Sequence, residues 1–80
     1  MQVITAGNIY NVSSHTSNRV NVIDVSDQRG NKVGGIVIDD GIEQAHITDK
    51  NGNIVEVNYF EVDAMTINEL VQWVVLHEDS

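Results

Sequence analysis

Most of the chain consists of short apolar segments separated by turn residues, a pattern that is typical of β-strands. Asn51-Gly52 lies between two such segments, and Asn-Gly in this position is the strongest short signal for a β-hairpin. Gly30 lies in a similar turn, "DQRGN", where glycine can take the positive φ angle that a short loop needs. Two hairpins in succession predict an antiparallel meander. The predicted strands are Gln2–Thr5, Asn8–Val12, Arg19–Ser26, Lys32–Asp40, Ala45–Asp49 and Asn53–Val62, with a polar loop over Ser13–Asn18.

The alternation of apolar and polar residues changes phase within the last predicted strand. Val55 and Val57 share one parity, whereas Phe60 and Val62 share the other. A side-chain period of two cannot place both pairs on one buried face. Either a bulge near Asn58 shifts the phase, or both faces of this strand are covered.

Two other features indicate curvature. The segment "VNVIDV" (Val20–Val25) shows a similar change of phase. In the next strand, the pair Gly34-Gly35 suggests a bend or the close approach of another backbone. We therefore expect a strongly curved, partly barrel-like sheet.

The last part of the chain has the periodicity of a helix. Thr66 and Glu69 have the spacing of a capping box. In this motif the side chain of each residue accepts a hydrogen bond from the backbone amide of the other. Asp63, just upstream, would interact favourably with the positive end of the helix dipole. The predicted helix spans Thr66–His77. Its residues expected to face the sheet are Ile67, Leu70, Val71 and Val74.

Trp73, Val75 and Leu76 make the apolar stripe of this helix wider than one sheet face requires. One interpretation is a helix sunk deeply in a small core. The other is an exposed apolar strip for self-association or partner binding.

The predicted fold is a single α+β domain over residues 1–80. It has a curved antiparallel sheet of four to six strands, a β-hairpin meander, with one C-terminal helix packed on it. The chain has no cysteine, which excludes a disulfide framework or a cysteine-based zinc site and favours a cytoplasmic location.

Negative charge is concentrated in the second half of the chain. Twelve acidic residues against four basic ones give a net charge of −8. Residues 1–32 have three basic and two acidic residues, whereas residues 33–80 have one basic and ten acidic residues. This distribution disfavours direct binding to nucleic-acid phosphates or to an anionic bilayer, and it favours a basic protein as partner. The alternative is that acidity only maintains solubility.

None of the patterns that would carry catalysis or metal binding is complete. His15, His46 and His77 lie on three different predicted elements, without the spacing of a zinc site. The segment "DKNGN" begins like a calcium loop but has Ile54 where the loop requires glycine. The carboxylates of Asp39, Asp40 and Glu43 cluster around Gly41, but no nucleophile or phosphate-binding loop accompanies them. We predict no enzymatic activity, no metal and no cofactor.

We therefore predict a non-enzymatic acidic binding protein, with possible homodimerisation through Trp73, Val75 and Leu76. Its size and charge are typical of small bacteriophage-encoded inhibitors that occupy a basic nucleic-acid-binding surface of a host protein, such as a CRISPR complex, a restriction enzyme or RNA polymerase. Alternatives are a structural or assembly domain, a homo-oligomer, or an antitoxin-like partner of a basic toxin. We also expect that turn carboxylates contribute little to stability. The residues predicted to bind the partner are Asp39, Asp40, Glu43, Asp49, Glu56, Glu61 and Asp63.

Overall fold

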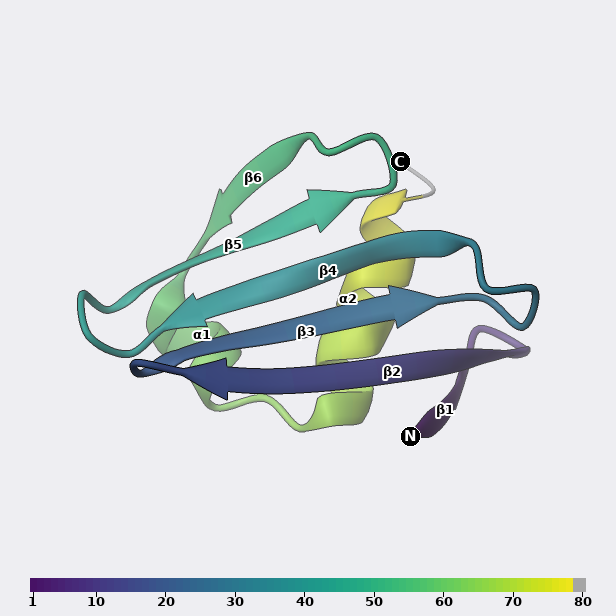
Figure 1. Cartoon of the computed structure of the whole chain (residues 1–80), viewed down its shortest axis with the longest axis horizontal. Coiled ribbons are helices and arrows are strands. Elements are labelled where there is room, and N and C mark those ends of the chain that lie inside the picture. Colours follow the sequence, from purple (N-terminus) through teal and green to yellow (C-terminus); the bar gives the residue numbers. More distant parts are fainter. Residues whose placement is uncertain (79–80) are drawn as a thin grey trace.

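Six strands and two helices follow one another along the chain (Figure 1). The computed structural model describes residues 1–78, and the side chains of residues 1–76. Each strand pairs antiparallel with the next, in the order β1-β2-β3-β4-β5-β6, so the predicted α+β meander is confirmed. The sheet is open, with β1 and β6 at its edges. The elements are β1 (Gln2–Thr5), β2 (Asn8–Ser17), β3 (Val20–Ser26), β4 (Lys32–Asp39), β5 (Gln44–Asp49), β6 (Ile54–Val57), α1 (Tyr59–Asp63) and α2 (Ile67–Glu78).

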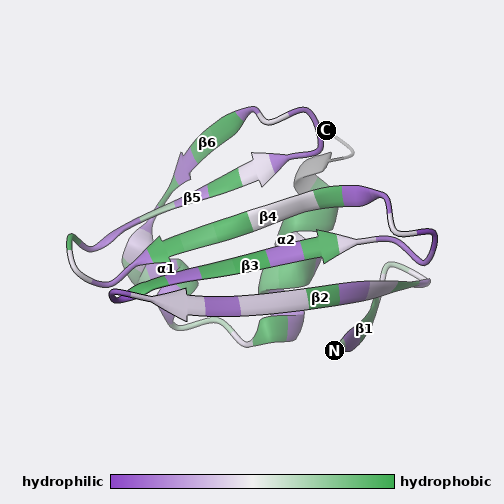
Figure 2. Ribbon diagram, viewed as in Figure 1, coloured by the Kyte–Doolittle hydropathy of each residue, from purple (hydrophilic) through white to green (hydrophobic). Residues whose placement is uncertain are grey.

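Both helices lie on the same side of the sheet, behind the strands in the view of Figure 1. The face of the sheet toward the helices carries the buried apolar residues, and it meets the buried side of α2 in one hydrophobic cluster. In Figure 2 the long hydrophobic segments lie on β3 and β4, the central strands. The largest fully buried side chains are those of Val25, Ile36, Ile47, Val62, Val71 and Val74.

The other face of the sheet is not covered by either helix (Figure 1). Strand pairing places His15, Val22, Val37, His46 and Glu56 in one row across five strands of this face. The two valines at its centre are half-buried. The phase change predicted in β3 therefore has a simple cause. Val20 and Val22 lie on the open face, whereas Ile23 and Val25 lie on the buried face. Apolar residues therefore occupy both faces of β3, and the register of the strand shifts only after Val25.

Gly34 is the point where α2 approaches the sheet most tightly. A Cβ atom at this position would lie 2.6 Å from the Thr48 carbonyl oxygen and 2.9 Å from Val74 Cγ1. A Cβ atom at Gly35 would lie 2.8 Å from the Ile23 carbonyl oxygen. The predicted close approach of another backbone at this glycine pair is confirmed.

The two longer hairpin loops have the same construction. In Asp27–Asn31, the Gly30 amide donates to the Asp27 carbonyl oxygen at 3.1 Å, and Gly30 has a φ of +87°. In Asp49–Asn53, the Gly52 amide donates to the Asp49 carbonyl oxygen at 3.1 Å, and Gly52 has a φ of +84°. Each loop is a four-residue turn that ends in a left-handed glycine, as the sequence predicts.

Two predicted segments are wrong. The polar loop over Ser13–Asn18 is instead the second half of β2, and only Asn18 and Arg19 form the turn, with φ of 50° and 66°. Pairing with β3 satisfies the backbone of this polar segment, which is exposed. In Figure 2 this half of β2 is pale or purple and contains no hydrophobic green.

The strand predicted over Asn53–Val62 is also wrong in its second half. β6 ends at Val57, and Asn58 caps α1 by accepting a hydrogen bond from the Glu61 amide at 3.0 Å. The phase change therefore marks the start of a helix and not a bulge. This short helix precedes the predicted C-terminal one, which is confirmed as α2.

The predicted capping box of α2 is confirmed. The Glu69 amide donates to Thr66 Oγ1 at 3.2 Å, and the Thr66 amide donates to Glu69 Oε1 at 3.1 Å. No helix among residues 1–78 is both long and apolar enough to cross a bilayer.

Candidate functional site

Three of the predicted carboxylates gather around Tyr59, where the β4–β5 turn meets α1. The Tyr59 hydroxyl donates to Asp40 Oδ1 at 2.7 Å, and Asn21 Nδ2 donates to Asp40 Oδ2 at 3.1 Å. The hydrogen bond to Asp40, together with desolvation and the charges of Asp40, Asp63 and Glu43, raises the pKa of Tyr59 from 10.0 to about 12. The phenol therefore keeps its proton and ties α1 to the end of β4. We call Asp40, Glu43, Glu61 and Asp63 the acidic end of the molecule.

Three of these four carboxylates have no partner within the described residues to neutralise them. Among the described residues, Glu43 and Asp63 make no hydrogen bond or ion pair through their carboxylates, and the same holds for Glu61 on α1. Arg19 is the basic residue nearest in the fold, because its carbonyl oxygen accepts from the Asp40 amide at 2.9 Å. Its guanidinium makes no ion pair within the described residues. The acidic end therefore presents uncompensated negative charge to solvent.

Exposed apolar residues accompany this charge. Phe60 on α1 is 67% exposed, and its ring packs edge-on against Tyr59, with centroids 5.1 Å apart. Ile42, in the turn between β4 and β5, is 64% exposed. Phe60 therefore lies outside the core, although Val62, two residues further along α1, is buried.

Three predicted carboxylates have a structural role in turns. Asp39 Oδ1 accepts from the amides of Gly41 at 2.9 Å and Ile42 at 3.3 Å. Asp49 Oδ1 accepts from the amides of Asn51 at 2.8 Å and Asn53 at 2.9 Å. Asp40 holds Tyr59, as described above. Each of these carboxylates thus satisfies backbone or side-chain donors.

The structure does not bring all seven predicted residues together. Asp49 is the last residue of β5, at the end of the sheet opposite the acidic end (Figure 1). Glu56 lies on the open face, paired with His46 across β5 and β6. The sequence could not show this division, because it depends on which end of each strand carries each residue.

A groove adjoins the acidic end. We call it the α1–α2 groove. It has a volume of about 310 Å³. Trp73 is half-buried and packs against the core, whereas Leu76 is 54% exposed. Trp73 therefore lies at the border between core and surface. The residues that line the groove are Glu61, Met65, Glu69, Gln72, Trp73 and Leu76.

Val75 does not belong to this exposed strip. It is only 4% exposed and is part of the core, so its assignment to a self-association surface is wrong. The helical stripe is wide because α2 is sunk against the sheet on one side while Trp73 and Leu76 remain accessible. Val75 thus fits the interpretation of a helix sunk deeply in the core, while Trp73 and Leu76 form an accessible apolar strip.

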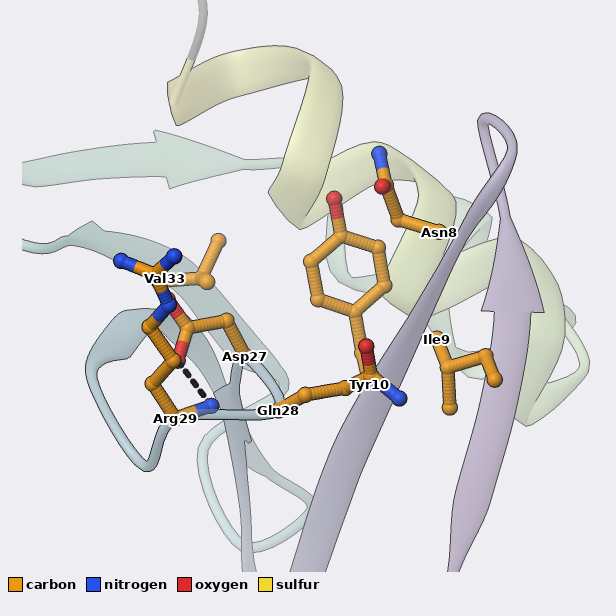
Figure 3. Close-up of a pocket in the computed structure, with 7 residues that line it drawn as sticks. All are labelled: Asn8, Ile9, Tyr10, Asp27, Gln28, Arg29 and Val33. Carbon is orange, nitrogen blue, oxygen red and sulfur yellow. Dashed lines mark hydrogen bonds between the residues drawn. The ribbon is translucent and has the colours of Figure 1, made fainter.

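A second cavity, of about 370 Å³, lies at the end of the sheet away from the acidic end (Figure 3). Tyr10 extends into it from β2, and Arg29 extends into it from the loop between β3 and β4. The Arg29 amide donates to Asp27 Oδ1 at 2.9 Å. Hydrogen bonds from the loop amides, that of Asn31 foremost, lower the pKa of Asp27 below 3.8. None of the residues predicted to bind a partner lines this cavity, whose walls are Asn8, Ile9, Tyr10, Asp27, Gln28, Arg29 and Val33.

No group of three histidine or acidic side chains in the described part of the chain is arranged to hold a metal ion. Comparison with protein-family models, with curated proteins and with solved structures found no match to this chain.

Proposed function

We propose that the protein is a non-enzymatic binding module that docks through its acidic end onto a basic surface of a partner protein. The observation that carries this proposal is the group of unpaired carboxylates Glu43, Glu61 and Asp63 beside the exposed ring of Phe60. An exposed aromatic residue is a frequent energetic centre of a protein interface, and charges at the same end of the molecule select the partner.

Apart from Asp40, the carboxylates at the acidic end make no hydrogen bond or ion pair within the described residues. The three unpaired carboxylates repel one another and make no stabilising contact within the described residues, which leaves partner binding as a physical reason for their position. Opposite charge on the partner would accelerate association and suppress wrong partners. Salt would weaken the complex, because exposed charges are screened beyond about 8 Å at physiological ionic strength.

Basic protein surfaces in a cell commonly bind nucleic acid, so a carboxylate-rich surface would compete with phosphates for the same site. On this ground we propose that the protein inhibits a nucleic-acid-binding protein in the cytoplasm, in the manner of small bacteriophage-encoded inhibitors. It would act by occupying the partner's surface and would need no chemistry of its own.

The test is capture of partners from a bacterial lysate at low and at high salt, followed by competition with the captured protein's own nucleic-acid ligand. Glu43→Lys and Asp63→Lys together should abolish the capture and leave the fold intact. Glu56→Lys is the matched control, because Glu56 is also exposed and makes no ion pair or hydrogen bond through its carboxylate within the described residues, but lies on the open face. Equal capture by the variant and the wild type, without competition by nucleic acid, would refute the proposal.

Self-association is a second candidate, favoured by strand β6. This edge strand carries Ile54, which is 66% exposed, and Val55, which is 39% exposed. An edge strand with apolar side chains can pair with the edge of another chain. Light scattering over a range of concentrations would detect a dimer, and Val55→Lys should abolish it if the β6 edge is the contact.

A further inference from the structure

The lining of the α1–α2 groove combines apolar side chains with negatively charged ones. Trp73 and Leu76 come from successive turns of α2, and Met65 comes from the segment that joins the two helices. Glu61 and Glu69 contribute carboxylates to the same lining. An apolar side chain could enter this groove while positive charges beside it meet the carboxylates.

The two carboxylates are held in different ways. Glu69 is fixed by the capping box, where its Oε1 also accepts from the Thr66 hydroxyl at 3.0 Å. Glu61 is unpaired within the described residues, but its backbone is fixed by the Asn58 cap at the start of α1. Both carboxylates therefore remain in the lining of the groove, and the two negative charges add to each other.

The groove favours a helix over a strand as its occupant. It is built from α2 and from the segment that joins the helices, and β6, the nearest edge strand in sequence, does not line it. A strand would find no free row of backbone amides and carbonyls with which to pair. A helix requires none, because its backbone is satisfied internally and only its side chains enter the groove.

Charge argues against a second copy of this chain in the groove. The four basic residues of the chain lie in turns or at the start of β4, and neither helix contains one. The chain therefore has no basic helix to offer. A helix with lysine or arginine beside its apolar face must come from another protein.

We propose that the α1–α2 groove binds a basic amphipathic helix of the partner, with a leucine-like side chain inserted against Trp73 and Leu76. This inference rests on the proposed function, because it identifies the part of the basic partner that is recognised. It adds an apolar anchor next to the acidic end, which shares Glu61 with the groove.

The experiment uses the fluorescence of Trp73, the only tryptophan in the chain. The probe is a synthetic peptide of leucine and lysine, with leucines at helical spacing i, i+3, i+4 and i+7. We expect a saturable blue shift of Trp73 emission as the peptide displaces water from the groove. A peptide with glutamate in place of lysine is the charge control and should produce no shift.

Variants test the two components of the groove separately. Leu76→Ser should weaken peptide binding by about tenfold, because part of the apolar contact is lost. Ile4→Ser is the matched control, since Ile4 is 73% exposed on β1, outside the groove, and should leave the affinity unchanged. Glu61→Gln with Glu69→Gln should reduce the salt dependence, and glutamine at position 69 preserves the capping box.

The failures of the two proposals can be told apart. If a partner is captured and depends on Glu43 and Asp63, but the peptide leaves Trp73 emission unchanged or Leu76→Ser binds as well as wild type, the groove inference is wrong and the proposed function stands. Equal binding of the acidic peptide would also overturn the inference. Loss of lysate capture with retained peptide binding to the groove would instead refute the wider function.

Discussion

Substitution of Gly34 by alanine should be among the most damaging single-methyl changes in this protein. The added Cβ would lie 2.6 Å from the Thr48 carbonyl oxygen and 2.9 Å from Val74 Cγ1, both well inside van der Waals contact. Either β5 must move away from β4, which weakens their pairing, or α2 must rise from the sheet. Because the nearest atom belongs to the backbone of a paired strand, a side-chain rotation cannot relieve the clash.

The size of the effect follows from two opposing terms. Overpacking of this kind costs about 1–3 kcal/mol, and a backbone contact places Gly34 near the upper end. Alanine also reduces the conformational entropy of the unfolded chain, which stabilises the folded protein by about 0.4–1 kcal/mol. The net loss is about 2 kcal/mol, which is a large share of the roughly 4–12 kcal/mol expected for 80 residues. The melting temperature should fall by about 8–16 °C.

The assay is urea denaturation followed by Trp73 fluorescence and by far-ultraviolet circular dichroism. Gly41→Ala is the control, because a Cβ at Gly41 would lie 3.1 Å from Asp39 Oδ1, an atom at the end of a side chain, and should cost less. The double variant Gly34→Ala with Val74→Ala should lose less than the sum of the single losses, since one of the two clashes disappears. A midpoint for Gly34→Ala equal to that of wild type would refute the packing of α2 on β4 described here.

Two further predictions concern local features. Gly52→Val should destabilise the protein by about 1–3 kcal/mol, because a β-branched residue is strained at a φ of +84°. Gly52→Asn should cost less, since asparagine tolerates the left-handed backbone conformation. A denaturation midpoint of Gly52→Val equal to that of the wild type would mean that this glycine is not left-handed. The second concerns Tyr59, whose folded pKa of about 12 exceeds its usual 10.0, so its contribution to stability is complete below pH 10 and is lost as the pH rises toward 12. Phenolate absorbance of the wild type should show a tyrosine that titrates near pH 12, and this transition should be missing in Tyr59→Phe. Absence of the late transition in the wild type would contradict the Tyr59–Asp40 hydrogen bond.

Turns and helix ends were predictable from the sequence because they depend on residues a few positions apart. The loops Asp27–Asn31 and Asp49–Asn53 close through bonds within five residues, and each needs a glycine that accepts positive φ. The capping box of α2 likewise lies within four residues. The charge of the chain and its bias toward the second half also follow from the sequence alone.

The tertiary structure decided which residues share a surface. Asp40 meets Asn21 and Tyr59, each 19 positions away, because strand register brings the β4–β5 turn beside β3 and α1. Ser13–Ser17 form a strand because pairing with β3 satisfies their backbone, although their side chains are polar. The apolar stripe of α2 divides into a buried residue, Val75, and an exposed one, Leu76, only when the helix is laid against the sheet. Local interactions thus determined most of the turns and the start of α2, whereas the second half of β2, the acidic end and the groove exist only because packing brought distant parts of the chain together.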